Sequence, residues 1–365
     1  MSETNLALSS LQRLGMPNFC FTTLCTSGYI SYTSGLYLNL KRFYPDIPLV
    51  ICGLDEKTRD FFNKVGDPLL ITVSGNEIWG EDCWKNLSCR MKPDERAFAS
   101  KSAISVWLLE HGYKQMLFLD SDTYLLDRID DVIQMLLKHD ILIIPSRFTL
   151  ENWRKARVGN FNAGIFGFAS PALQVAQVFK ALCFDRCLNF QLDNLFFEQK
   201  FFDLFVHYNR TGIIRDLGIN VQGSDFNELK PQQKEDGNWY VADGTKIRLF
   251  HATTPTPRDF PLVKEKLAFD REAKAKLSGT DISLSQNRVE MKKKLRITAF
   301  VKRIGIKWLA GKFWKGYIRA VKAFQDLNRV VSLTEEFSLL TRIRETYFHK
   351  AKLLAKLQDC HKKKQ

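Results

Sequence analysis

The chain has 365 residues, of which 45% are hydrophobic and 26% are charged, and its formal net charge is +14. This composition allows a sizeable core, and no run approaches the roughly 20 uninterrupted apolar residues of a membrane-spanning helix. The eight cysteines form no C-x-x-C pair, which argues against a zinc ribbon or a redox motif. Because the first residues also lack the pattern of a signal peptide, we expect a cytoplasmic globular protein with reduced cysteines.

Positive charge is concentrated at the C-terminal end. Residues 286–365 contain 21 Lys and Arg against 6 Asp and Glu, whereas residues 1–285 contain 33 against 34. The sequence therefore predicts two parts, a nearly neutral body over 1–285 and a basic tail over 286–365.

Short apolar runs and helical patterns alternate along the body. Residues 78–90 show no clear period, and Asp127 and Asp130 stand where their side chains could cap a following helix. Alternation of this kind predicts β-α-β units and a largely parallel sheet, which is an α/β fold. The predicted strands are 19–25, 48–52, 69–73, 116–119 and 141–144, and the predicted helices are 30–43, 56–65, 96–111 and 129–138.

The stretch LFLDSDTYLL, residues 117–126, places two carboxylates directly after an apolar strand. Asp120 and Asp122 are thus expected at the carboxyl end of a strand, where open α/β sheets bind their ligands. Two carboxylates held close together repel each other unless a cation joins them. Mg²⁺ or Mn²⁺ is the natural cation, and Mg²⁺ is usually held by carboxylates together with substrate phosphates. The pair therefore predicts a metal and phosphate site.

Two known families use such a pair. In haloacid-dehalogenase-like phosphatases a nucleophilic Asp ends a strand, and an acid/base Asp follows two residues later. Here Thr123 comes one residue too early for that pattern, Tyr124 stands where Thr or Val is usual, and at least three predicted strands precede the pair. This match is the weaker one. A phosphatase, or a nucleotidyltransferase on a similar sheet, that uses Asp120 and Asp122 stays an alternative.

The second family is matched at more places. The sequence resembles the nucleotide-sugar glycosyltransferases with the GT-A fold, family 8 and its relatives, at four segments in the same order. They are similar to the family's D-x-D, Asn-Ala-Gly, D-Q-D and H-F-x-G-x-x-K-P segments, and read ASKSAISVWLLEHGYKQMLFLDSDTYLL (99–126), NFNAGIFGF (160–168), FQLDNLFF (190–197) and LFHATTPTP (249–257). The resemblance covers roughly residues 19–260. It implies a GT-A, Rossmann-like fold with a mostly parallel central sheet.

The resemblance also implies a reaction. A sugar would pass from a nucleotide-diphosphate donor, with a UDP-sugar as the first expectation, to a glycan or glycolipid acceptor, with retention of configuration. Asp120, Asp122 and His251 would bind the metal, and a histidine ligand suits Mn²⁺ better than Mg²⁺. His251 could instead be a hydrogen-bonded histidine at a strand end. Lys101 would contact the donor, or else be a solvated helix lysine.

The remaining roles follow from the same resemblance. Asp193 and Gln191 would face the sugar as the catalytic pair, although Gln191 stands where many relatives have an acidic residue, and Asp193 could instead cap a helix near Asn194. Thr22, Thr23, Cys25 and Tyr29 would line the base pocket, with Tyr29 stacking on the base or buried in the core. Asn162, Ala163 and Gly164 would lie against the sugar. The donor-binding set is Thr22, Thr23, Cys25, Tyr29, Lys101, Asp120, Ser121, Asn162, Ala163 and Gly164.

The basic tail has its own pattern. From residue 297 its apolar residues, including Trp308 and Trp314, recur at helical spacing with Lys and Arg between them. Such a helix suits an anionic membrane surface, where each basic residue contributes about 1 kcal/mol. A helical cap packed on the body is an alternative, and the Trp-rich face argues against a nucleic-acid arm.

We therefore expect an enzyme peripheral to the inner face of the cell membrane, in the synthesis of surface polysaccharide or lipopolysaccharide. A non-catalytic membrane- or nucleic-acid-binding protein on a transferase fold is the other alternative.

Overall fold

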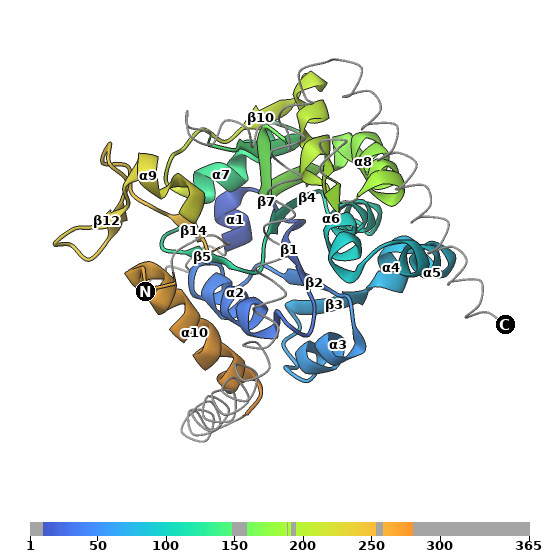
Figure 1. Ribbon diagram of the computed structural model, residues 1–365, viewed down its shortest axis with the longest axis horizontal. Coiled ribbons are helices and arrows are strands. Elements are labelled where there is room, and N and C mark those ends of the chain that lie inside the picture. The colour runs from blue at the N-terminus through green and yellow to red at the C-terminus, as the bar shows by residue number, and fades with distance from the viewer. Residues whose placement is uncertain (1–9, 148–158, 188, 191–194, 253–257, 280–365) are drawn as a thin grey trace, which may run out of the picture. The chain divides into compact units, whose positions relative to one another are not determined.

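The computed structural model describes residues 10–147, 159–187, 189–190, 195–252 and 258–279 (Figure 1). The chain divides into two compact units, Met1–Gly279 and Thr280–Gln365. The second unit lies outside the described residues, so the basic tail stays a prediction. Within the described residues, no helix has the length and apolar character needed to cross a membrane.

A seven-stranded sheet forms the centre of the fold, in the order β10-β6-β7-β4-β1-β2-β3. Neighbouring strands run parallel except at β7, which is antiparallel to both β4 and β6. The predicted α/β fold with a mostly parallel sheet is confirmed. The strands are β1 (Phe19–Cys25), β2 (Leu49–Gly53), β3 (Leu70–Ser74), β4 (Gln115–Leu119), β6 (Ile141–Pro145), β7 (Phe161–Ala169) and β10 (Thr211–Ile213).

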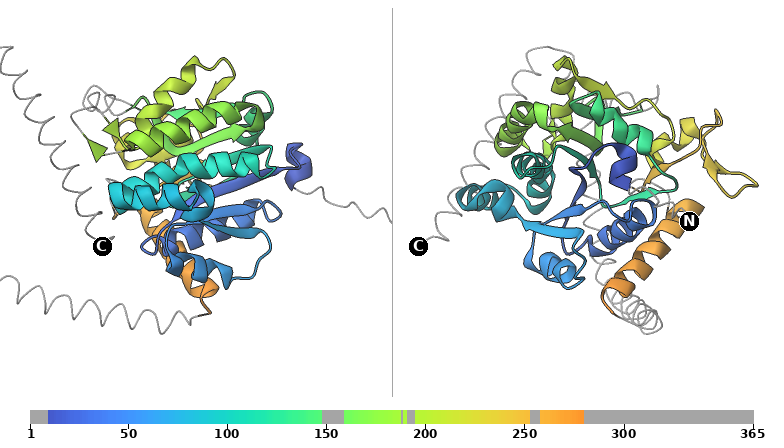
Figure 2. Two further views of the ribbon diagram at one scale, coloured as in Figure 1. Left: turned by 90° about the vertical axis from the view of Figure 1, so that its right-hand side faces the viewer. Right: turned by 180° about the vertical axis from the view of Figure 1, so that it is seen from behind.

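Helices cover both faces of this sheet (Figures 1 and 2). Alternate residues of each strand point to opposite faces, so Phe19 and Phe21 of β1 pack in one apolar cluster and Cys20 packs in the other. The first cluster includes residues of α1 (Ser10–Leu14), α2 (Ile30–Phe43), α3 (Glu56–Asn63) and α7 (Asp130–Gln134). The second includes residues of α4 (Gly75–Trp79), α5 (Glu81–Arg90), α6 (Pro93–Glu110) and α8 (Leu173–Arg186).

A smaller sheet begins where β4 ends. It has the order β11-β14-β5, with β11 at Ile219–Gln222, β14 at Leu249–His251 and β5 at Thr123–Leu125. Because only residues 120–122 separate β4 from β5, the two aspartates stand at the junction of the two sheets. His251 pairs with Thr123 across β14 and β5, so the same pairing brings it to this junction.

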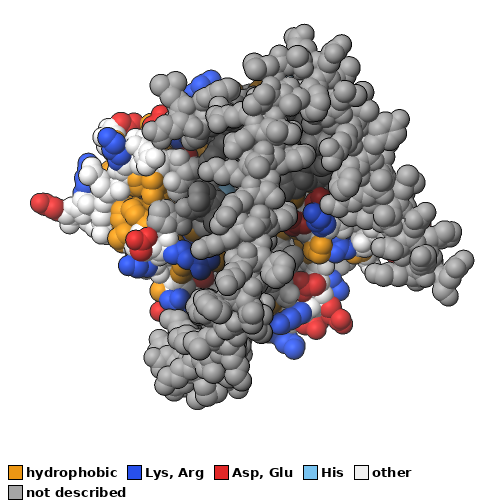
Figure 3. All heavy atoms as spheres, in the orientation of Figure 1, with side chains coloured by type: hydrophobic (Ala, Val, Ile, Leu, Met, Phe, Trp, Pro, Cys, Tyr) orange, Lys and Arg blue, Asp and Glu red, His pale blue; other side chains and the backbone are white. Residues whose placement is uncertain are grey.

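The remaining elements surround these two sheets. The helix α10 (Pro261–Leu277) packs along α2 (Figure 1). On the face seen in Figure 3, the described acidic and basic side chains are interspersed, in keeping with the nearly neutral charge of residues 1–285. The short elements are η1 (Met135–Leu137), η3 (Ser170–Ala172), β8 (Asn189–Phe190), β9 (Leu195–Phe196), η4 (Gln199–His207), η5 (Gly223–Asp225), α9 (Phe226–Leu229), β12 (Gln232–Gln233) and β13 (Trp239–Tyr240).

The stretch without a clear period, residues 78–90, falls in two helices. Ser74 caps α4 by accepting a hydrogen bond from the backbone of Glu77, whose carboxylate bonds back to Ser74, a capping box. Gly80, at φ +80°, ends α4 and begins α5. Both helices are short, which is why no apolar period emerges from the sequence.

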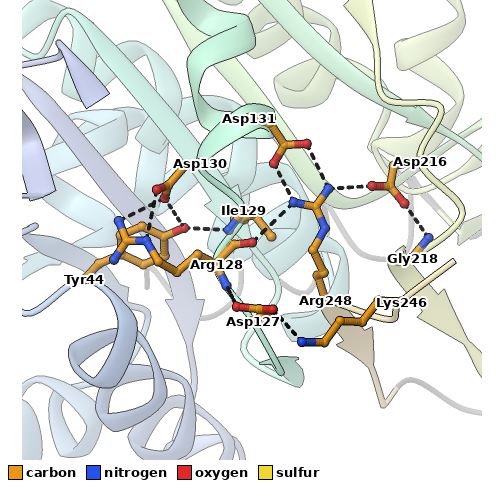
Figure 4. Close-up of polar contacts among 10 residues, drawn as sticks. All are labelled: Tyr44, Asp127, Arg128, Ile129, Asp130, Asp131, Asp216, Gly218, Lys246 and Arg248. Atoms are coloured by element: carbon orange, nitrogen blue, oxygen red, sulfur yellow. Dashed lines mark hydrogen bonds and ion pairs between the residues drawn. The ribbon is translucent and has the colours of Figure 1, made fainter. Parts of the chain in front are cut away.

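The predicted helix caps at Asp127 and Asp130 are wrong. The residue that precedes α7 is Ile129, and no side chain caps that helix. Asp127 instead pairs with Lys246, and Asp130 accepts a hydrogen bond from the Tyr44 hydroxyl (Figure 4). Both carboxylates therefore bind residues distant in sequence instead of the start of α7.

Candidate functional site

The loop over 120–122 is fastened on two sides. The backbone N–H of Asp120 donates to the carbonyl of Gly164 on β7, at 2.8 Å, and the N–H of Ala252 donates to the carbonyl of Asp122, at 3.0 Å. The Thr123 hydroxyl also donates to the Asp120 carbonyl, at 2.8 Å. These bonds tie the loop to both sheets and hold the two carboxylates at their junction.

Asp120, Asp122 and His251 come together as predicted for a metal site. One ligand atom from each lies within 4.8 Å of the others. His251 Nε2 is 3.1 Å from Asp122 Oδ1 and 3.7 Å from Asp120 Oδ2. Burial alone would raise the pKa of Asp122, but the attraction of His251 lowers it to about 2. Burial likewise lowers the pKa of His251, and Asp122 outweighs that effect and raises it. The attraction between His251 and Asp122 thus favours the charged form of both groups.

Asn220 orients the His251 ring. Its side-chain oxygen lies 2.9 Å from His251 Nδ1, so that nitrogen carries a hydrogen and Nε2 faces the carboxylates. The amide nitrogen of Asn220 donates in turn to Asn162 Oδ1, at 3.0 Å. Asn220 has φ +58°, a conformation that asparagine tolerates better than most residues. Two carboxylates and an oriented imidazole fit a divalent cation such as Mn²⁺. No motif in the sequence marks Asn220.

Gly164 leaves room for the same ring. A Cβ at this position would lie 2.5 Å from His251 Cε1. Asn162 Oδ1 accepts from the Gly164 N–H, at 2.8 Å, and the Ala163 carbonyl accepts from Lys101. These three residues lie beside His251 and Lys101, and their predicted place against the donor sugar stays a prediction.

Lys101 is buried and fully engaged. Its ammonium group lies 2.8 Å from Asp120 Oδ1 and 2.9 Å from Glu198 Oε1, and it donates to the Ala163 carbonyl at 3.1 Å. Burial lowers the pKa of Lys101, but Asp120 and Glu198 outweigh burial and raise it. With 3% of its surface exposed, it is not a solvated helix lysine.

Glu198 was not identified from the sequence. It is 2% exposed, and burial raises its pKa against the opposing effect of Lys101. Its second oxygen, Oε2, has no hydrogen-bond partner among the described residues. The available signal was an acidic residue in a Phe-rich stretch that also contains Asp203, which alone indicates no role.

A cleft of about 530 Å³ is lined in part by Asp120, Asp122 and His251, the three residues of the candidate metal cluster. Cys25, Tyr29 and Ser121 line it, and the Tyr29 side chain is about half exposed, at 49%. Thr22 and Thr23 are fully buried in β1, and the Thr22 hydroxyl donates to the Val50 carbonyl, so they do not line the base pocket as predicted. The other lining residues are Leu24, Thr26, Ser27, Leu54, Asp55, Trp84, Pro93, Asp94, Arg96, Ala97, Phe98, Lys101, Asp120, Asp122 and His251.

Asp55 lines this cleft and joins two of the segments that form it. Its carboxylate accepts hydrogen bonds from the N–H of Ser27, at 2.7 Å, and from the N–H and hydroxyl of Thr58, both at 2.9 Å. It therefore caps α3 and holds the loop after β1 at the same time. The predicted catalytic residues Gln191 and Asp193 lie outside the described residues, so their roles stay predictions.

A polar network holds β14, and with it His251, beside the loop that follows β5 (Figure 4). Arg248, directly before β14, pairs with Asp131 of α7 and with Asp216. Lys246 pairs with Asp127 at 2.7 Å. Arg248 also donates to the Arg128 carbonyl. The contacts with residues 127–131 join segments more than 110 residues apart, and together with Asp216 they set the position of the histidine.

No family model and no curated protein matches the sequence. Among solved structures, the fold is similar to that of galactosyltransferase LgtC, solved with donor and acceptor sugar analogues. The TM-score is 0.50 at 12% identity, over 73% of this chain and 99% of that chain.

Two further similarities have lower TM-scores. GlyE of Streptococcus pneumoniae TIGR4 gives 0.46 at 13% identity, over 75% of this chain and 63% of that chain. Mouse xyloside xylosyltransferase 1 gives 0.42 at 12% identity, over 66% and 99%. The likeness to LgtC shows the fold, and the chain has the predicted GT-A fold of glycosyltransferases.

Proposed function

We propose that the chain is a metal-dependent glycosyltransferase that takes its sugar from a nucleotide-diphosphate donor. The observation that carries this proposal is the Asp120, Asp122 and His251 cluster at the junction of the two sheets. It opens on a cleft of about 530 Å³, a size that suits a nucleotide-sized ligand. The GT-A fold supports the same reading.

The three residues would hold Mn²⁺ or Mg²⁺, and the bound ion would act as a Lewis acid on the diphosphate leaving group. The protein's own contribution is to keep the ligands ready. Asn220 keeps His251 Nε2 turned toward the carboxylates, and Lys101 fixes one oxygen of Asp120. Tyr29 and Ser27 line the same cleft, where the Tyr29 ring would stack on the base of the donor.

Several finer points belong to the proposal and rest on the sequence resemblance. They are a UDP-sugar donor, retention of configuration, and a place for Asp193 and Gln191 near the reacting sugar. A glycan or lipid-linked acceptor and a membrane-bound tail also belong here. Sedimentation of the full chain with anionic and with neutral liposomes tests the proposed membrane binding of the tail. Equal binding to both kinds of liposome would contradict that part of the proposal.

The function itself is tested by thermal unfolding with UDP-, GDP-, CMP- and dTDP-sugars, each with and without Mn²⁺. We expect one nucleotide to stabilise the wild type only with Mn²⁺, by about 2.7 kcal/mol at a hundredfold excess over its Kd. Asp122→Asn should lose this shift, whereas Asp185→Asn, an exposed carboxylate paired with Arg186, should keep it. A wild type that no nucleotide stabilises in Mn²⁺ would contradict the proposal.

A further inference from the structure

Three basic side chains line the cleft, and two of them are already committed. Lys101 is neutralised by Asp120 and Glu198, and His251 faces Asp122. Arg96 differs, since it forms no ion pair with any described carboxylate, although Asp55 and Asp94 line the same cleft. It is therefore the cation of the described cleft whose charge is unbalanced.

The surroundings of Arg96 hold it in place and leave it short of partners. Its Nη1 donates to the Ser88 hydroxyl at 2.6 Å, and the guanidinium lies 5.4 Å from the centre of the Trp84 ring. Its Nε is buried and has no hydrogen-bond partner among the described residues. Burial lowers the pKa of the Arg96 guanidinium. A partly desolvated cation without an anion costs free energy, so this arrangement fits a ligand that supplies one.

Formal charges at the metal cluster indicate which ligand group needs this cation. A divalent ion there would be balanced by Asp120 and Asp122, and Lys101 is balanced by Glu198. The diphosphate of a nucleotide-sugar would therefore keep most of its negative charge. A guanidinium presents a planar set of donors that matches phosphate and carboxylate oxygens.

We infer that Arg96 binds an anionic oxygen group of the substrate, either a phosphate of the donor or a carboxylate on the donor sugar. This inference rests on the proposed function, since it names the part of that site that recognises negative charge. Trp84 and Ser88, both on α5, position the guanidinium at the start of α6. The segment whose sequence showed no period thus supplies one wall of an anion subsite.

The test is isothermal titration of the full chain in Mn²⁺ with uridine, UMP, UDP, pyrophosphate, UDP-glucose and UDP-glucuronic acid. Arg96→Met removes the charge, Arg96→Lys keeps the charge without the planar group, and Ser88→Ala removes only the hydrogen bond to Arg96. We expect Arg96→Met to weaken UDP binding about 10- to 100-fold and to leave uridine binding unchanged. Arg96→Lys should recover part of the loss, and Ser88→Ala should cost less.

The affinity for Mn²⁺ alone and the melting temperature without ligand serve as controls. The Mn²⁺ affinity should stay at the wild-type value in Arg96→Met, since Arg96 contacts none of Asp120, Asp122 and His251. The melting temperature should change little, because the lost contacts with Ser88 and Trp84 are offset by removal of a partly desolvated charge. A loss shared by UDP and pyrophosphate assigns Arg96 to the diphosphate. A loss seen only with UDP-glucuronic acid assigns it to a sugar carboxylate.

The two proposals fail in different ways. If the wild type binds pyrophosphate in an Arg96-dependent manner and binds no nucleotide, the proposed function falls and the anion subsite stands. If the wild type binds nucleotides and Arg96→Met binds every anionic probe equally well, the subsite falls and the function stands. An equal loss of Mn²⁺ affinity in Arg96→Met, or a wild type that binds no anionic probe, also overturns the subsite.

Discussion

Two buried lysines in this protein have opposite settings. Lys266, on α10, contacts both oxygens of Asp270 one turn later on the same helix, at 2.9 and 2.8 Å. Lys101 contacts Asp120 and Glu198, which come from segments far apart in the sequence. The ion pair of Lys266 lies within one helix, whereas Lys101 links Asp120 and Glu198 beside the cleft.

The comparison separates charges that hold helices from charges that prepare a site. Asp270 packs against Gly35 of α2, where a Cβ would lie 1.8 Å from its carboxylate oxygen, so this pair marks the contact of α10 with α2. Burial raises the pKa of Asp270 to about 6, with Lys266 opposing. Lys266 also lowers the pKa of Asp122, after the larger effect of His251, so the two regions are linked weakly.

The largest expected effect comes from removing each lysine. Lys101→Met leaves two carboxylates without their partner, and breaking a buried ion pair costs about 3–5 kcal/mol of stability. Lys266→Met should cost less, because it leaves one carboxylate, Asp270, without its partner rather than two. Urea unfolding measures both losses.

Mn²⁺ sharpens the same contrast. It should restore part of the stability of Lys101→Met, since Asp120 is one of the three proposed metal ligands, and little of that of Lys266→Met. Equal losses in the two variants, with equal shifts in Mn²⁺, would show that the two clusters do not differ in role.

Substitutions at Gly164 and Gly35 give a second contrast, with effects of intermediate size. Gly164→Ala places a Cβ 2.5 Å from His251 Cε1, so the ring must move. Loss of the contacts that orient a metal-binding histidine costs about 10- to 100-fold in metal affinity. Gly35→Ala overpacks Asp270 and should cost about 1–3 kcal/mol of stability with little change in metal affinity. Titration with Mn²⁺ and thermal unfolding separate the two, and a Gly164→Ala protein with wild-type Mn²⁺ affinity would refute the role given to Gly164.

The smallest expected effect is a pH dependence. The pKa of His251 is raised, so its attraction to Asp122 stabilises the metal-free protein below about pH 6.5, the ordinary value, and is lost as pH rises through the folded pKa. Mn²⁺ needs the neutral ring, so its affinity should rise with pH, by up to about tenfold per pH unit, and level off above that pKa. His251→Gln should bind more weakly without this slope. A wild-type affinity that is flat from about pH 5.5 to about 7 would contradict the assignment of His251.

The grouping of Asp120, Asp122 and His251 was predictable because each stands in a segment with a recognisable pattern. Asp120 and Asp122 directly follow an apolar strand, and His251 stands in a segment with its own motif. Glu198 and Asn220 were missed, because neither carries a motif and each acts only through a residue distant in sequence. Thr22 and Thr23 were misplaced, because a polar residue in a strand can face the cleft or hydrogen-bond inside the sheet, and Thr22 does the latter.

By itself, the sequence determined the α/β fold and the order of strands and helices over residues 19–144, apart from α4, α5 and β5, and it singled out Asp120, Asp122 and His251. Periodicity and a charged pair after an apolar run are readable within a few residues, so these features need no tertiary contact to be seen. The tertiary structure decided that Asp120 and Glu198 balance Lys101, that Asn220 orients His251, and that no carboxylate in the described part of the chain pairs with Arg96. Those outcomes depend on contacts between segments such as α6 and Glu198, which only packing brings within hydrogen-bond distance.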